Sequence, residues 1–167
     1  MSQDFLFDHH IIPAFVPVAD AFAGGITTEA VSLANYRRAT LVILTGARED
    51  TGISNLVTID ACTTAAGGTT AAVAFKYRSM PYTTSVDTWT ALTDATSSGY
   101  NFAVNNTGAN VVWFIEVAVE DVIAAVPDAR FIRAAIAETA NKTITAAGVW
   151  ILSDPRYPGA IPVQAIA

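Results

Sequence analysis

The sequence predicts an all-β protein, an antiparallel β-sandwich or jelly roll of about eight to ten short strands with little helix. Segments between Arg38 and Ser153 alternate apolar and polar residues with the period of two that half-buried strands require. They are rich in Val, Ile and Thr, which favour strands. Gly, Asn and Pro interrupt these segments at roughly ten-residue intervals, the spacing of turns in a sandwich.

The first part of the chain predicts an arm followed by an edge strand. Residues 1–10 carry Phe5, Leu6 and Phe7, and this segment is too short to fold alone and too apolar to stay in water, so we expect it to dock on another surface. Pro13 and Pro17 lie within residues 11–19. Because proline removes a backbone donor from the ladder, this segment is predicted to be an edge strand or an extended arm.

The middle of the chain predicts a series of strands separated by turn residues. Residues 111–119 form a continuous apolar run, which favours a central strand. Residues 70–79 show the clearest separation of an apolar and a polar face, and we expect them to form one continuous strand. The remaining predicted strands are residues 30–33, 38–45, 55–63 and 99–104.

Helix is expected only in residues 120–125, as a single turn before Pro127. Residues 129–137 are rich in Ala, which favours helix, but their alternation predicts a strand. Asn141 then predicts a hairpin turn into the last strand, residues 143–153.

Length and composition predict one domain with a surface made for contact. The 167 residues fit a single domain over residues 11–158, flanked by the arm, residues 1–10, and a tail, residues 159–167. Hydrophobic residues make up 52% and charged residues 14%, against the roughly 25% charged that is usual in soluble domains. Either small Ala and Val side chains in the sheets account for the apolar excess, or a sizeable patch is covered by neighbouring subunits. The second alternative fits a homo-oligomer, a dimer or trimer.

Charge and hydropathy argue against two classes of partner. The net charge is −6, and the nine Lys and Arg are scattered, so no basic stripe is available for nucleic acid. No apolar run reaches the roughly 18 residues that a membrane-spanning helix requires. Residues 1–4 lack the basic segment of a signal peptide, which predicts a protein made in the cytoplasm. The lone Cys62 rules out an internal disulfide, and we expect it to be a small buried hydrophobe rather than a reactive thiol.

The chain offers little catalytic equipment, so we expect no enzyme activity, no cofactor and no metal site. The neighbours His9 and His10 point to opposite sides of an extended chain. No Gly-rich phosphate loop and no serine elbow is present. Three carboxylates lie in or near predicted strands, but nothing in their spacing brings any two of them together: Asp60, Asp87 and Glu116. We expect Glu116 to face solvent or an Arg partner.

Three aromatic residues leave two interpretations open. They could line a carbohydrate site, as aromatics do in lectin sandwiches, or pack in the core, and core packing is favoured. They are Trp89, Tyr100 and Trp113.

One resemblance covers most of the chain. Four segments occur in the same order as in a family of small structural proteins encoded among the head genes of tailed bacteriophages and prophages, which the chain resembles. They are residues 32–46 (SLANYRRATLVILTG), 74–78 (AFKYR), 114–117 (FIEV) and 149–158 (VWILSDPRYP). The resemblance implies a capsid decoration or cement protein, a β-sandwich or jelly roll at the capsid surface of the virion that binds the major capsid protein lattice. The alternatives are a head-completion or tail-tube subunit and, more distantly, a carbohydrate-binding sandwich.

A cement protein needs contacts rather than an active site, and aromatic and Arg side chains supply most anchoring energy at interfaces. Pro155 and Pro158 stiffen the exit from the last strand and present the two residues between them. The alternative for Tyr157 is that it caps the core. The candidate interface residues are Phe5, Phe7, Phe15, Arg156 and Tyr157.

Overall fold

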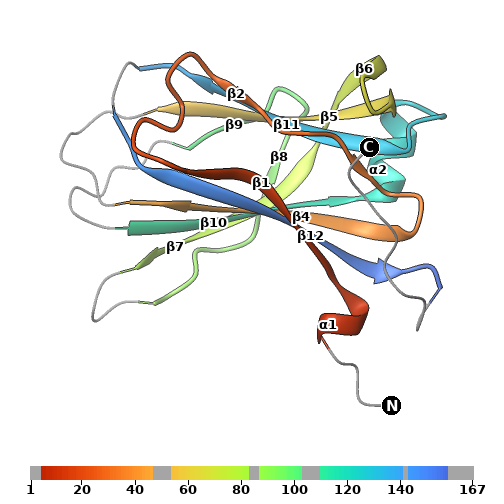
Figure 1. The fold of residues 1–167 in the computed structure, drawn as a ribbon, viewed down its shortest axis with the longest axis horizontal. Coiled ribbons are helices and arrows are strands. Elements are labelled where there is room, and N and C mark those ends of the chain that lie inside the picture. The colour runs from red at the N-terminus through yellow and green to blue at the C-terminus, as the bar shows by residue number, and fades with distance from the viewer. Residues whose placement is uncertain (1–4, 47–53, 83–86, 103–109, 141–142, 158–167) are drawn as a thin grey trace.

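Two antiparallel sheets packed face to face make up the computed structural model, which describes residues 5–46, 54–82, 87–102, 110–140 and 143–157 (Figure 1). The prediction of an all-β sandwich is therefore confirmed. The described residues hold twelve strands, more than the eight to ten expected, because several are only two or three residues long.

Sheet A has six strands in the order β1-β12-β4-β10-β7-β8. The apolar run predicted to be central is β10, which pairs with β4 on one side and β7 on the other. The predicted edge strand is also confirmed, because among the described strands β1 pairs only with β12. The strands are β1 (His10–Val18), β12 (Ala146–Pro155), β4 (Tyr36–Thr45), β10 (Asn110–Ala118), β7 (Phe75–Tyr82) and β8 (Thr93–Ala95).

Sheet B follows the order β2-β11-β5-β6, with β3 also paired to β11 and β9 also paired to β5. The Ala-rich segment whose alternation predicted a strand is β11, which confirms that interpretation. The strands are β2 (Ile26–Thr27), β3 (Val31–Ser32), β5 (Asn55–Thr64), β6 (Gly67–Val73), β9 (Tyr100–Asn101) and β11 (Phe131–Glu138).

The prediction of one strand over residues 70–79 is wrong, because the chain changes sheets at Ala74. β6 pairs with β5 in sheet B, whereas β7 pairs with β10 and β8 in sheet A. Val73 and Phe75 on either side of this corner are both buried. The alternation continues without a break because both halves face the same core, so the corner leaves no trace in the pattern.

The predicted hairpin between the last two long strands is also wrong. β11 pairs with β5 in sheet B, and β12 pairs with β4 in sheet A, so the chain crosses the sandwich between them. Asn141 itself lies outside the described residues. Such repeated crossings between sheets are the winding of a jelly-roll-like sandwich.

Two short helices complete the described residues. The helical turn expected before Pro127 is α2 (Val119–Ala125), which carries Glu120 and Asp121 in its first turn, where acidic side chains favour helix. It ends at the extended Val126, the conformation that a following proline favours. The predicted arm contains α1 (Phe5–Asp8), which lies below sheet A in the view of Figure 1. No helix in the described part of the chain is long and apolar enough to cross a membrane.

A continuous chain of aromatic rings fills the space between the sheets. Its rings come from both sheets and from the loops between them, with neighbouring centroids 3.7 to 6.5 Å apart. Tyr77 of sheet A stacks on Tyr100 of sheet B at 3.7 Å, which ties the two layers together. In order, the chain runs Phe15, Phe22, Phe102, Trp113, Tyr100, Tyr77 and Phe75.

Cys62 fits the interpretation as a small buried hydrophobe. It is fully buried and forms no disulfide. Burial raises the pKa of its thiol, which keeps the thiol in its unreactive protonated form.

Gly148 makes room for one end of the aromatic chain. A Cβ at this position would collide with the ring of Phe15 on the neighbouring strand. We therefore predict that Gly148→Ala lowers the free energy of unfolding by about 1–3 kcal/mol, measured by urea denaturation. Gly46→Ala is the control, because a Cβ there meets only ordinary contacts. Equal stability of the two variants would show that Phe15 does not pack on this glycine.

The Tyr77–Tyr100 stack makes stability sensitive to alkali. Burial raises the pKa of Tyr100 to about 12, and Tyr77 adds to the shift through its charge and a side-chain hydrogen bond. Because the folded pKa lies above the ordinary value of 10.0, this contribution is complete below pH 10 and is lost as the pH rises to about 12. We predict that Tyr100→Phe reduces the loss of unfolding free energy over this pH range, followed by denaturation at each pH. Tyr82→Phe, which removes an exposed hydroxyl, should behave like the original protein, and identical profiles for all three would contradict the assignment.

Candidate functional site

The outer face of sheet A is the candidate interaction surface on the described residues. Strand register places its residues in rows that cross neighbouring strands. Two rows are almost wholly apolar. The first joins Pro13, Val149, Val42 and Phe114 and ends at Arg78, and the second joins Ala147, Leu44, Val112 and Met80.

These residues face outward because their neighbours along each strand are buried in the core. On β4, Leu41 and Ile43 are fully buried, whereas of the two row residues Val42 has 7% of its surface exposed and Leu44 is half exposed. A sheet face turned to water normally carries polar residues. The apolar rows here therefore mark a surface that is suited to a partner.

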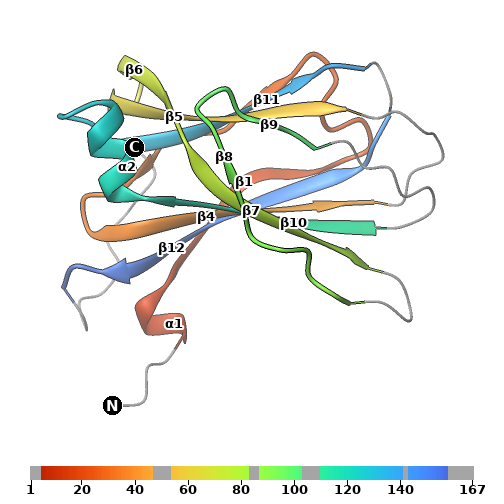
Figure 2. The ribbon, with the colours of Figure 1, turned by 180° about the vertical axis from the view of Figure 1, so that it is seen from behind.

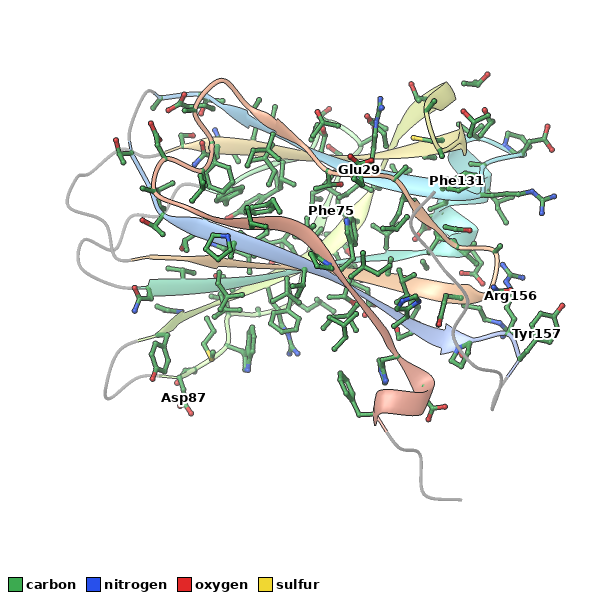
Figure 3. All side chains as sticks on the ribbon, viewed as in Figure 1. Glu29, Phe75, Asp87, Phe131, Arg156 and Tyr157 are labelled. Carbon is green, nitrogen blue, oxygen red and sulfur yellow. The ribbon has the colours of Figure 1, made fainter. Side chains whose placement is uncertain are left out.

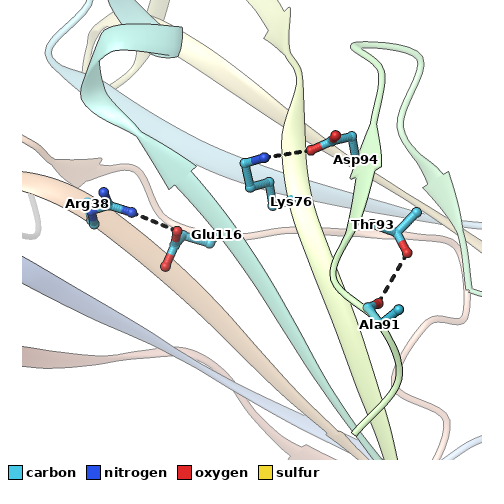
Figure 4. A network of polar contacts seen from close by, with 6 residues as sticks. All are labelled: Arg38, Lys76, Ala91, Thr93, Asp94 and Glu116. Atoms are coloured by element: carbon cyan, nitrogen blue, oxygen red, sulfur yellow. Dashed lines mark hydrogen bonds and ion pairs between the residues drawn. The ribbon is translucent and has the colours of Figure 1, made fainter.

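A third row on the same face carries the charged residues. In register across the strands it joins Ile11, Ile151, Thr40, Glu116, Lys76 and Asp94. Lys76 Nζ lies 2.8 Å from Asp94 Oδ1. Arg38 Nη1, near the start of β4, lies 2.9 Å from Glu116 Oε1 (Figure 4). Hydrogen bonding to Asp94 raises the pKa of Lys76, so the lysine stays charged at neutral pH.

Arg78 is the cation of this face that is held by an aromatic ring rather than by a carboxylate. Its guanidinium carbon lies 4.5 Å from the centre of the Trp89 ring. Trp89 in turn meets Phe114 edge to face at 4.9 Å. No ion pair is found for Arg78 among the described residues. Its guanidinium is therefore held against the Trp89 ring, and a guanidinium has the planar geometry that binds a carboxylate through two hydrogen bonds.

A groove crosses this face under the N-terminal helix. Phe5 of α1 stacks on His9 at 4.2 Å and forms one wall, and Leu92 stands on the other side with 62% of its surface exposed. The hollow has a volume of about 470 Å³. Its lining residues are Phe5, His9, Thr40, Lys76, Arg78, Leu92, Phe114, Glu116, Ile151 and Ser153.

The five candidate interface residues do not converge on one surface. Phe5 is half exposed at the groove, and Phe7 belongs to α1 but its side chain lies outside the described part. Phe15 packs against the core at Gly148. Arg156 and Tyr157 lie together at the far end of β12, well away from Asp87 (Figure 3).

Tyr157 does not cap the core, because 68% of its surface is exposed. It borders a second, smaller hollow of about 300 Å³ at the end of the sandwich, which α2 and the exit of β12 enclose. The exposed Ile123 of α2 lies in the same hollow. The backbone N–H of Arg156 donates to the carbonyl of Asn35 at 2.9 Å, which fixes this exit.

The aromatic residues with two open interpretations divide between core and surface. Trp113 is buried and Tyr100 belongs to the aromatic chain, so core packing is confirmed for both. Trp89 lies on the outer face of sheet A instead, against Phe114 and Arg78. Sequence reasoning missed the outer rows because it assigned strands without their neighbours. Only the register brings Val42, Phe114 and Val149 side by side.

The polar residues that were considered for chemistry are held apart. His9 stacks on Phe5, whereas His10 lies near Tyr36. Glu116 pairs with Arg38, as expected of a carboxylate with an Arg partner, and Asp60 lies 3.6 Å from Arg133 Nε. Within the described ranges, no three His, Cys, Asp or Glu side chains gather to hold a metal ion.

Comparison with known proteins gives only distant structural likeness. No protein family matches the sequence, and no curated protein matches it. Solved structures that align include VP2 of infectious bursal disease virus, at 14% identity and a TM-score of 0.27 over 89% of this chain and 40% of that one. Desmodium yellow mottle tymovirus aligns at 12% identity and a TM-score of 0.17, over 92% of this chain and 91% of that one. The chain thus spans less than half of the VP2 protein, and TM-scores of this size do not establish a shared fold.

The ion pairs on the outer face contribute little to folding because their side chains are largely exposed. We predict that Glu116→Gln and Arg38→Ala each change the free energy of unfolding by less than about 1 kcal/mol, measured by chemical denaturation. Trp150→Ala, which empties a fully buried site, should cost about 3–5 kcal/mol in the same assay. A large loss in Glu116→Gln would mean that the pair supports the fold instead of lying at its surface.

Proposed function

We propose that this protein is a structural component of a virion, a capsid decoration or cement protein that binds the lattice of a major capsid protein. It acts by contact and not by catalysis. The observation that carries the proposal is the apolar outer face of sheet A, on a chain with only 14% charged residues. The resemblance of residues 32–46, 74–78, 114–117 and 149–158 to head-gene proteins of tailed bacteriophages and prophages supports the same role.

The outer face of sheet A has the composition of a contact surface. The centre of a protein interface is depleted in charge and enriched in aromatic residues, Met and Arg. Phe114, Trp89, Met80 and Arg78 lie together on this face. Aromatic and Arg side chains that are already fixed by one another lose little entropy when a partner arrives.

The charges of the face are arranged so that it can be covered. Glu116 and Lys76 already have partners on the same face. A partner that covers them therefore buries paired charges, which costs much less than burying single ones. Arg78 is the exception, because it contacts an aromatic ring and not a carboxylate; a partner that covers it would need to supply a carboxylate.

The alternative roles differ in what the purified protein does. A head-completion or tail-tube subunit forms rings or tubes by itself. A carbohydrate-binding sandwich needs an open aromatic platform, but the ring of Trp89 is already occupied by Arg78. The decoration role accounts for the whole apolar face and is the function that we favour.

The test is co-sedimentation of the purified protein with expanded phage capsids that lack it. We expect saturable binding at a fixed ratio to the major capsid protein. Leu44→Lys and Leu92→Asp, which place charges on the outer face of sheet A, should each weaken binding by roughly tenfold or more, because a charge is buried without a partner.

Ile123→Lys is the matched control, since it changes an exposed apolar residue in the smaller hollow beside Tyr157. It should bind like the original protein. Loss of binding in Ile123→Lys or Tyr157→Ala, with Leu44→Lys unaffected, would move the contact to the end of the sandwich. Absence of binding, together with rings or tubes in solution, would overturn the decoration role in favour of a tail or connector subunit.

A further inference from the structure

The free edges of the two sheets are protected unequally. An edge strand exposes unpaired backbone N–H and C=O groups, and proteins usually block such edges with prolines, bulges, charges or short strands. At one edge of sheet A, β1 contains Pro13 and Pro17 and two irregularities in its register. At the other edge, β8 is three residues long, and its Asp94 pairs with Lys76 of β7.

Among the described residues, one edge of sheet B is formed by very short strands and the other by a longer strand, β6, which pairs with β5 and has α2 nearby (Figure 2). β2 and β3 cover one side with two residues each. On the other side lie the two-residue β9 and the seven-residue β6. The β6 sequence, GGTTAAV, contains neither proline nor charge. Gly68, Thr69, Thr70 and Ala72 are exposed.

We propose that β6 is a self-association edge, at which two copies of this chain pair their β6 strands antiparallel across a two-fold axis. Sheet B then continues through the dimer in the order β2-β11-β5-β6-β6-β5-β11-β2. The expectation of a homo-oligomer thereby gains a specific surface, and the pairing does not depend on the proposed virion role.

A second copy is the partner that fits β6 best, because the strand is complementary to itself. Antiparallel pairing about a two-fold axis at Thr70 sets Thr70 against Thr70 of the second copy, Thr69 against Ala71 and Gly68 against Ala72. Like charges in such positions repel, and β6 has none. Its side chains are small, and Thr opposite Thr is a favourable cross-strand pair. Most soluble oligomers close with this symmetry.

The charges nearest to β6 do not oppose the pairing. In register, Ala72 lies beside Asp60 and Asp60 beside Arg133. The Asp60 carboxylate lies 3.6 Å from Arg133 Nε, and both side chains are largely covered. Each copy therefore brings a compensated pair toward the axis rather than a net charge.

Sedimentation equilibrium of the purified protein at increasing concentration tests the proposal. We expect a reversible dimer. Thr70→Lys, which sets two like charges against each other at the axis, should weaken dimerisation by at least about tenfold. Thr70→Val keeps a β-branched side chain and should remain a dimer. Thr27→Lys places the same charge on β2 at the opposite edge of the sheet and should also remain a dimer.

A cysteine cross-link keeps the test decisive if Thr70→Lys unfolds, which a thermal melt would reveal. Thr70→Cys should yield a disulfide-linked dimer under mild oxidation, whereas Thr27→Cys should not, and the buried Cys62 does not interfere. A protein that is monomeric at every concentration would overturn the proposal. So would a dimer that persists in Thr70→Lys but dissociates in Leu44→Lys, because that pairing would use sheet A. Capsid binding by a monomeric Thr70→Lys would leave the proposed virion role intact.

Discussion

The packing of aromatic rings between the two sheets is the constraint on which the rest of this structure depends. Seven rings run from Phe15 at the β1 edge to Phe75 at the corner between the sheets. Large rings bury much apolar surface per residue, so a chain of Ala, Val and Thr strands can still form a well-filled core. Gly148 is needed because the ring of Phe15 lies where a side chain would stand. Tyr77 and Tyr100 join the two layers directly.

These aromatic rings face the core, but other large apolar residues lie outside it. Phe114, Val149 and Leu44 lie on the outer face of sheet A, away from the core that the inner residues of the same strands fill. Their polar neighbours are tied to each other, Arg38 to Glu116 and Lys76 to Asp94. The result is a face that is apolar in the middle, has few uncompensated charges and presents one fixed guanidinium at Arg78. A face of this composition supports the proposed role of binding another protein.

Strand periodicity predicts much of this fold, but strand neighbours come from contacts distant in sequence. Four strands were predictable because apolar residues that face the core alternate along them with residues that face outward: β4, β5, β10 and β11. The change of sheet at Ala74 was not, since the alternation passes through it unbroken. Phe15 was predicted to be an interface residue, and it packs on the core because Gly148 of a distant strand leaves room for it. The rows on sheet A depend on register, which no single strand encodes.

In the role that we propose, the outer face of sheet A is the surface that contacts the capsid. Cryo-electron microscopy of capsids decorated with it would test that claim most directly, because a β-sandwich placed in the density has a defined orientation. We expect Phe114, Leu44 and Arg78 to lie against the capsid, with a capsid carboxylate near Arg78. Density that instead placed sheet B, or the hollow beside Tyr157, against the capsid would contradict it.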